Sequence, residues 1–291
     1  MGTEIFSLEG KRALVTGASR GIGAAIALGF AECGADVAVT ARSTSDLEEL
    51  AGKIEATGRR GVSITCDVTK TEDIARCVDV AMEHLGGIDV LVNNAGGTRF
   101  MAPVLALREE GWDKAINLNL KSVFTFCQRV GAHMVEHGSG SVINVASIGG
   151  LHASPTLSFY GAAKAGVVSL TKTLSVEWGN AGVRVNAVCP GWVRTELNRN
   201  LWGEDPALAT ATVQNVPLQR WGETSDIVRV APPGWNVRVI QPAAAIKEYR
   251  CPGCNQVIRI GTKHVVAWRE DAEDLRRHWH LPCWERHAAA R

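Results

Sequence analysis

The sequence lacks several features that would assign it to particular classes of protein. No apolar run is long enough to cross a bilayer, and the N-terminus shows no basic stretch followed by an apolar one. The 31 basic and 30 acidic residues nearly cancel, so the net charge of +1 implies no attraction of the whole chain to nucleic acid or membranes. With 291 residues, 46% of them apolar, the chain is expected to form one large globular domain, alone or with a small one.

Paired cysteines are also missing from most of the chain. Five of the eight cysteines lie singly in apolar surroundings, which is typical of reduced thiols and favours a cytoplasmic protein. The other three fall within the last 63 residues, together with four of the nine tryptophans. This final stretch has eleven basic and six acidic residues, so it differs in composition from the rest.

A glycine-rich turn near the N-terminus follows a predicted buried strand, residues 11–16, and precedes a predicted helix, residues 24–33. Gly17 would permit a tight turn, Gly21 would let the backbone approach a pyrophosphate, and Gly23 would allow close packing of helix on strand. The free N–H groups at the start of the helix also favour phosphate. We therefore expect a dinucleotide site here, although an ordinary strand–helix turn has the same outline.

Arg42 follows the second predicted strand, residues 36–40, at a position where an acidic residue would hold a ribose 2′-hydroxyl. An arginine suits a 2′-phosphate instead, and Arg20 in the glycine turn is a second candidate. The sequence therefore favours NADP, with NAD as second choice. A solvated surface charge is the alternative interpretation of either arginine.

Four further short apolar runs, separated by segments of helical spacing, are predicted to be strands: residues 64–67, 88–92, 141–146 and 184–188. Alternation of strands and helices predicts an α/β fold with a doubly wound parallel sheet. Polar residues follow several of these strands, at the sheet edge where ligands bind in such folds. Asp67 is one of them, either as an adenine contact or as a turn residue.

Tyr160 and Lys164 are four positions apart on a predicted helix, so they share one face. A neighbouring cation lowers the pKa of a phenol, which is ordinarily about 10, and such a phenol can exchange a proton with a carbonyl or alcohol. Ser147, at the end of the preceding strand, would hold the same oxygen. An ordinary surface helix can show the same pair, so the pattern alone is weak evidence of catalysis.

These motifs occur in order and at suitable spacing, together with Asn119 and the two turns at residues 93–96 and 190–195. On them the chain, from about residue 5 to residue 228, resembles the short-chain dehydrogenase/reductase family. The resemblance implies a Rossmann-like fold and the NAD(P)-dependent interconversion of a small-molecule carbonyl and alcohol by hydride transfer. It is also compatible with a homo-oligomer.

The resemblance implies roles for single residues. Tyr160 would be the general acid/base, Lys164 would lower its pKa and hold the nicotinamide ribose, and Ser147 would orient the substrate oxygen. Asn119, rather than Asn117, would fix a water in a proton relay. The resemblance implies cofactor contacts at Gly17, Ser19, Arg20, Gly21, Ile22, Gly23, Arg42, Asp67, Val68, Asn94, Ala95, Gly96, Tyr160, Lys164, Pro190, Gly191, Val193 and Thr195.

Thr195 would contact the nicotinamide carboxamide. Substrate choice would depend on residues 196–219, with Leu197, Leu201 and Trp202 as candidate pocket walls unless they are ordinary packing residues. A small ketone, a steroid, a sugar and an acyl-thioester β-ketone all remain open as substrates, as does the direction of the reaction.

After Val228 the sequence departs from the family, which continues into a helix and a last strand. Pro232, Pro233 and Gly234 forbid a continued helix, so the last helix and strand are missing. This departure leaves open whether the enzyme is active. Residues 236–241 alternate in polarity, and we hypothesise that they fill the vacant edge of the sheet.

The end of the chain has the spacing of a metal site. Cys251, Cys254, His280 and Cys283 form a CxxC and an HxxC pair, which would hold Zn²⁺ in a tetrahedral site. Unbound thiols are the alternative, and other ligand candidates are His264, His278 and His287. The pattern resembles the poly(ADP-ribose) polymerase-type zinc finger, with a shorter loop between the pairs, and that resemblance implies contact with DNA.

The sequence thus predicts three segments: a dinucleotide-binding domain at residues 1–228, a linker at residues 229–250 and a zinc-binding module at residues 251–287. Two functions fit them. One is an NAD(P)-dependent oxidoreductase. The other is a catalytically impaired cofactor-fold protein whose zinc module binds nucleic acid or a protein partner.

Overall fold

The computed structural model of the chain forms two compact units. The first, here called the core unit, is Leu8–Val228, and the second, the tail unit, contains the chain from Arg229 onward. Within the described residues, no helix combines the length and apolar content needed to cross a membrane. The structure describes residues 7–98, 100–203, 205–228, 235–240, 245–262, 264–269 and 276–289.

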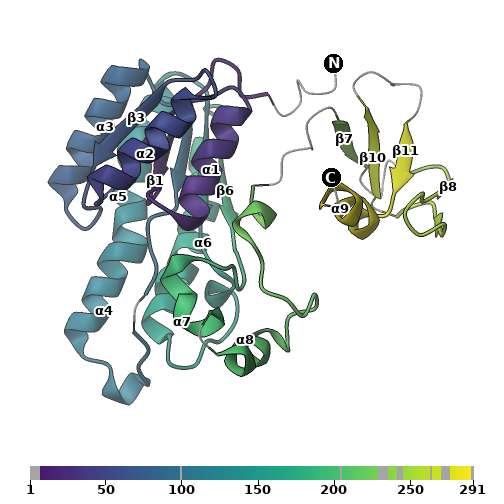
Figure 1. Ribbon diagram of the computed structural model, residues 1–291. Coiled ribbons are helices and arrows are strands. Elements are labelled where there is room, and N and C mark those ends of the chain that lie inside the picture. The colour runs from purple at the N-terminus through teal and green to yellow at the C-terminus, as the bar shows by residue number, and fades with distance from the viewer. Residues whose placement is uncertain are drawn as a thin grey trace. The chain divides into compact units, whose positions relative to one another are not determined.

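A parallel sheet forms the centre of the core unit (Figure 1). It has six strands in the order β3-β2-β1-β4-β5-β6. The strand order reverses between β1 and β4, which is the switch point where doubly wound sheets bind ligands. This arrangement confirms the predicted Rossmann-like α/β fold. The strands are β1 (Arg12–Thr16), β2 (Asp36–Ala41), β3 (Gly61–Thr65), β4 (Val90–Asn93), β5 (Gly140–Val145) and β6 (Val183–Val188).

Helices cover the sheet because successive strand residues point to opposite faces. Val15 of β1 belongs to a core cluster with residues of α1 and α2, whereas its neighbour Leu14 belongs to a cluster with residues of α3, α5 and α6. Full burial of one such side chain contributes about 1.5–3 kcal/mol. The helices are α1 (Gly21–Glu32), α2 (Thr44–Glu55), α3 (Thr71–Leu85), α4 (Glu109–Ile116), α5 (Ser122–Glu136), α6 (Ser158–Gly179), α7 (Arg199–Trp202) and α8 (Pro206–Val213).

Strand β6 ends the sheet, and its side chains alternate between buried and exposed. Val183 and Val185 are buried on one face, while Arg184 and Asn186 are exposed on the other. Parallel sheets ordinarily have both faces covered, whereas one face of β6 is exposed. Among the described residues no strand pairs with the outer edge of β6, as expected from the missing last helix and strand.

Strand β7 (Trp235–Ile240) does not fill that edge, so our hypothesis for residues 236–241 is wrong; Gln241 lies outside the described residues. Instead β7 pairs antiparallel with β10 (His264–Arg269) along its whole length. This ladder satisfies those main-chain groups of β7 that face β10 within the tail unit. A stretch that we assigned to a linker is therefore part of a sheet.

The tail unit contains a three-stranded sheet β11-β10-β7, a two-stranded hairpin of β8 and β9, and α9. Among the described residues of this unit, the buried apolar cluster comprises seven, Cys251 and Cys283 among them. So small a core usually needs a metal or disulfides for stability. The remaining elements are β8 (Tyr249–Arg250), β9 (Val257–Ile258), β11 (Arg277–Trp279) and α9 (Leu281–Ala289).

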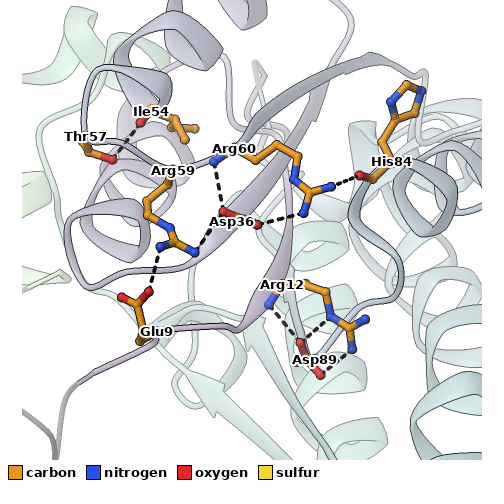
Figure 2. A network of polar contacts seen from close by, with 9 residues as sticks. All are labelled: Glu9, Arg12, Asp36, Ile54, Thr57, Arg59, Arg60, His84 and Asp89. Atoms are coloured by element: carbon orange, nitrogen blue, oxygen red, sulfur yellow. Dashed lines mark hydrogen bonds and ion pairs between the residues drawn. The ribbon is translucent and has the colours of Figure 1, made fainter.

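Ion pairs join the strands at their amino ends, at the edge of the sheet opposite their carboxyl ends (Figure 2). Arg12 contacts both carboxylate oxygens of Asp89, with Nε to Oδ2 at 2.8 Å and Nη2 to Oδ1 at 2.9 Å. The main-chain nitrogen of Arg12 also donates to Asp89 Oδ2. The hydrogen bond to the Arg12 guanidinium holds the pKa of Asp89 below its usual range, against the opposing effect of burial.

We predict that Asp89→Asn lowers the free energy of unfolding at pH 7 by about 1–2 kcal/mol, because it removes the charged hydrogen bonds to Arg12. The loss is modest because these groups are partly exposed and solvent screens their interaction. A carboxyl group with a lowered folded pKa stabilises the fold above its unfolded pKa of about 4 and loses that effect as the pH falls through the folded value. Urea titrations should therefore show the full difference at pH 7 and a difference that shrinks progressively as the pH falls below about 4. Asp79→Asn, an exposed residue of α3, is the control, and a difference independent of pH contradicts the prediction.

Candidate active site and candidate metal centre

The glycine turn between β1 and α1 has the backbone that its residues predict. Gly17 and Gly21 have φ angles of +64° and +60°, a region that favours glycine. A Cβ atom on Gly23 would overlap the side-chain amide of Asn94 and the carbonyl oxygen of Gly17. Helix α1 can therefore begin close to β1 and β4, with its first N–H groups at the switch point.

Thr16 connects this turn to the end of β4 by hydrogen bonds, a role that sequence reasoning missed. The main-chain nitrogens of Asn94 and Ala95 donate to Thr16 Oγ1 at 2.9 and 3.0 Å, and Thr16 Oγ1 donates to the carbonyl of Val92. The side-chain amide of Asn94 donates to the carbonyl oxygens of Thr16 and Gly17. No local signal marks this threonine, because its partners lie 76 to 79 positions away.

A cavity of roughly 690 Å³ lies along the carboxyl ends of the strands. Among the residues predicted to contact the cofactor, Gly23 is the one that does not line it, because it packs behind the turn. Their contacts with a cofactor stay predictions. Sequence reasoning missed other lining residues that bear no local signal, namely Cys66, Thr69, Lys114, Ala115 and Leu118.

Arg20 and Arg42 line this cavity and are exposed. Within the described part of the chain, neither guanidinium forms an ion pair or a hydrogen bond. Asp67 also lines the cavity, and its Oδ1 accepts hydrogen bonds from the nitrogen and hydroxyl of Thr69. Asp67 is therefore a turn residue, as one of the two interpretations of the sequence predicted, and it still faces the cavity.

Ser147, Tyr160 and Lys164 come together on the wall of the same cavity. Helix α6 positions Tyr160 and Lys164 one turn apart, with Lys164 Nζ at 5.8 Å from the centre of the tyrosine ring. Lys164 is only 3% exposed, and its Nζ donates to the carbonyl oxygen of Val145 at 2.7 Å. Ser147 follows β5, where its hydroxyl accepts a hydrogen bond from the nitrogen of Gly149.

Burial, rather than the neighbouring cation, dominates the pKa values of this pair. Burial raises the pKa of Tyr160 above its usual value, and a hydrogen bond with Ser147 opposes that shift. Burial also lowers the pKa of Lys164 to about 8. In this geometry the phenol is desolvated and the Lys164 ammonium donates to Val145, and the predicted lowering of the tyrosine pKa by Lys164 stays a prediction.

Asn119 is fully buried at a π-helical turn, Asn117–Lys121, that joins α4 to α5. Its Oδ1 accepts from the nitrogen of Gly97, while its Nδ2 donates to the carbonyl oxygens of Gly97 and Ala115. Both polar atoms of the Asn119 side chain are therefore already hydrogen-bonded to main-chain groups. Asn117 has a different partner, because its side-chain amide donates a hydrogen bond to the carbonyl oxygen of Thr69.

In the tail unit, four predicted metal ligands lie together. The ligand atoms of Cys251, Cys254, His280 and Cys283 all lie within 4.8 Å of one another. The two cysteines of the first pair come from the turn between β8 and β9, and the second pair comes from the start of α9. The alternative ligands lie outside this cluster: His264 and His278 hydrogen-bond to each other at 2.8 Å, and His287 stacks on Trp279.

The thiols of this cluster differ in acidity. Burial would raise the pKa of Cys251, but main-chain N–H groups of His280, Cys254 and Gly253 together lower it to about 6. Burial and the two neighbouring thiols raise the pKa of Cys283 to about 11. Three thiolates at this distance repel one another unless a cation joins them, so the donor set fits a divalent metal with tetrahedral preference.

Comparison with known proteins separates the two units. A family model described as short chain dehydrogenase matches residues 11–205. The 3-oxoacyl-(acyl-carrier-protein) reductase of Thermotoga maritima is 39% identical over 223 residues, which is 77% of this chain and 89% of that protein.

Solved structures agree with the sequence comparison. A short-chain type dehydrogenase/reductase from Mycobacterium marinum is 36% identical with a TM-score of 0.73, over 78% of this chain and 89% of that one. A gluconate 5-dehydrogenase from Burkholderia cenocepacia, solved with NADP and tartrate, is 34% identical with a TM-score of 0.74 over the same shares.

A second family model, described as Rv1322 family protein, matches residues 228–285. The tail unit thus resembles a family of its own. The resemblance to a poly(ADP-ribose) polymerase-type zinc finger is not confirmed by these comparisons, and the DNA contact that it implied stays a prediction.

Proposed function

Because the chain belongs to the short-chain dehydrogenase/reductase family of NAD(P)-dependent oxidoreductases, we propose that Tyr160 is its general acid/base and NADP its preferred cofactor. This proposal rests on one observation: the glycine turn, Ser147, Tyr160 and Lys164 line the same cavity. The bound nicotinamide would supply or accept the hydride. The chain would supply position, hydrogen bonds and a proton.

Tyr160 suits proton donation. A phenol with a raised pKa is protonated at neutral pH, and this form can donate to the oxygen of a carbonyl substrate. The Ser147 hydroxyl would hold the same oxygen. Lys164 would bind the nicotinamide ribose, since Nζ has donors left after its bond to Val145. A proton relay at Asn119 would use its main-chain carbonyl, because the side chain is already bonded.

The substrate is expected to be a small carbonyl or alcohol. The relatives named above include a 3-oxoacyl-(acyl-carrier-protein) reductase and a gluconate 5-dehydrogenase, which supports testing acyl-thioester β-ketones, sugar acids and small ketones. Absorbance at 340 nm with NADPH and each substrate class tests the proposal. Turnover of one class supports it, and no turnover across all classes by folded chain that binds NADPH contradicts it.

Arg20 and Arg42 support the preference for NADP, and a relative of known structure contains this cofactor. We predict that Arg20→Ala/Arg42→Ala weakens NADPH binding by about 10- to 100-fold and leaves NADH binding nearly unchanged, since each lost charged hydrogen bond to the 2′-phosphate costs about 1.5–3 kcal/mol in full and less at an exposed rim. Calorimetric titration of both cofactors measures this. Arg129→Ala, an exposed change on α5 outside the cavity lining, is the control. Equal losses for both cofactors contradict the assignment.

In the tail unit we propose that Cys251, Cys254, His280 and Cys283 hold one structural Zn²⁺. Four protein ligands would leave no open position for catalysis, which is typical of structural sites. The ion would join the turn between β8 and β9 to the start of α9. Binding of nucleic acid or a protein partner by this unit, in a chain whose cofactor fold is impaired, stays the alternative function.

A further inference from the structure

Asn198 lies at the centre of the hydrogen bonds in the cavity lip, by which we mean residues 193–202. Its Oδ1 accepts from the main-chain nitrogen of Thr195 at 3.1 Å and from Nε1 of Trp202 at 3.0 Å. Its Nδ2 donates to the carbonyl oxygen of Val193 at 2.9 Å. Amide and indole N–H groups only donate and a carbonyl only accepts, so the orientation of the Asn198 amide is fixed.

This fixed amide sets the direction of the hydrogen bond between two side chains. Thr195 Oγ1 lies 3.1 Å from Asn198 Oδ1, and the amide oxygen has no proton to give. The threonine hydroxyl must therefore donate its only proton to Asn198. Any group in the cavity then meets only lone pairs on Thr195 Oγ1.

The rotamer of Thr195 is also held from its other side. A Cβ atom on Gly21 would lie 3.3 Å from Thr195 Cγ2, so the threonine methyl group packs against the glycine turn. The hydroxyl points to Asn198 and the methyl to α1. Both Thr195 and Asn198 line the cavity.

We propose that Asn198 is a positioning residue that makes Thr195 an obligatory acceptor for the amino group of the nicotinamide carboxamide. This inference rests on the proposed function, in which Thr195 contacts that carboxamide. A carboxamide presents an amino donor and an oxygen acceptor, and a freely rotating hydroxyl could accept from the amino group or donate to the oxygen. With Asn198 in place only the amino group can bond to Thr195, so the rotation of the carboxamide is determined.

The test uses the 3-acetylpyridine analogue of NADPH, in which a methyl group replaces the amino group. The ratio of its Kd to that of NADPH is measured by calorimetry on the full chain. The expected wild-type ratio is about 5 to 10, the equivalent of one hydrogen bond. In Asn198→Ala the hydroxyl can turn and donate to the acetyl oxygen, so the ratio should fall to about 1.

Two further variants separate positioning from general loosening of the lip. Trp202→Phe removes another donor from Asn198 Oδ1 but keeps the contact with Thr195, so the wild-type ratio should persist. Thr195→Val should give a ratio of about 1, and adding Asn198→Ala should change it no further. This double-variant comparison shows whether the asparagine acts through the threonine.

The inference is overturned if Asn198→Ala keeps the wild-type ratio, or if Trp202→Phe loses it equally. A wild-type chain that binds NADPH but does not distinguish the analogue overturns this inference and leaves the proposed function standing. A folded wild-type chain that does not bind NADPH counts against both.

Discussion

Tyr160→Phe is expected to lower kcat by roughly a thousandfold, because proton transfer by a positioned side chain contributes about 10²–10⁴ to the rate. The substitution removes one oxygen from a buried side chain and leaves the ring in place on α6. The affinity for NADPH should stay within about twofold, since the glycine turn and Lys164 are unchanged. Stopped assays with the substrate found for the wild type, together with calorimetric titration of NADPH, measure both quantities.

Matched variants define what this result means. Phe159→Leu, beside Tyr160 on α6 and fully buried, tests whether disturbance of that helix alone reduces the rate. Ser147→Ala should lower kcat less than Tyr160→Phe, because it removes a hydrogen bond to the substrate oxygen and not the proton donor. Turnover by Tyr160→Phe at the wild-type rate would refute the role assigned to the tyrosine.

Loss of zinc is expected to unfold the tail unit. Elemental analysis of the intact chain should find one zinc per chain, and Cys251→Ala/Cys283→Ala should contain none. Binding of structural zinc contributes about 10–16 kcal/mol to folding in small modules, a large share of what stabilises a unit with so small a buried cluster. Hydrogen exchange should therefore become fast along β10 in the double variant, while the core unit keeps its protection.

A cysteine outside the cluster supplies the control for this experiment. Cys33→Ala, a partly buried position in the core unit, should retain the full zinc content. Chelation of the wild type should reproduce the exchange pattern of the double variant. Wild-type chain that contains no zinc but still protects β10 from exchange would show that the four residues are not a structural metal site.

The parallel sheet and the glycine turn could be predicted because their signals are local. Short apolar runs followed by segments of helical spacing specify strands and helices, and Gly17 adopts the positive φ that its turn requires. The cysteine and histidine cluster was predictable for a related reason. A CxxC turn and an HxxC helix start each fix one half of a tetrahedral site.

Other features depend on contacts between distant parts of the chain and have no local signal. The alternation of residues 236–241 predicted a strand correctly but could not show that its partner would be β10. The spacing of Tyr160 and Lys164 predicted their proximity but not the burial that raises one pKa and lowers the other. Asn198 is a different case, because its partners lie only 3 to 5 positions away. It forms a capping box with Thr195, a local arrangement that sequence reasoning missed.

The central claim is that the core unit binds its cofactor although the last helix and strand of the family are missing. Titration of the intact, folded chain with NADPH tests this claim most directly. We predict saturable binding of one NADPH per chain, with weaker binding of NADH because Arg20 and Arg42, which line the cavity, are proposed to bind the 2′-phosphate. Absence of saturable binding by a chain whose circular dichroism shows an intact fold would contradict the account.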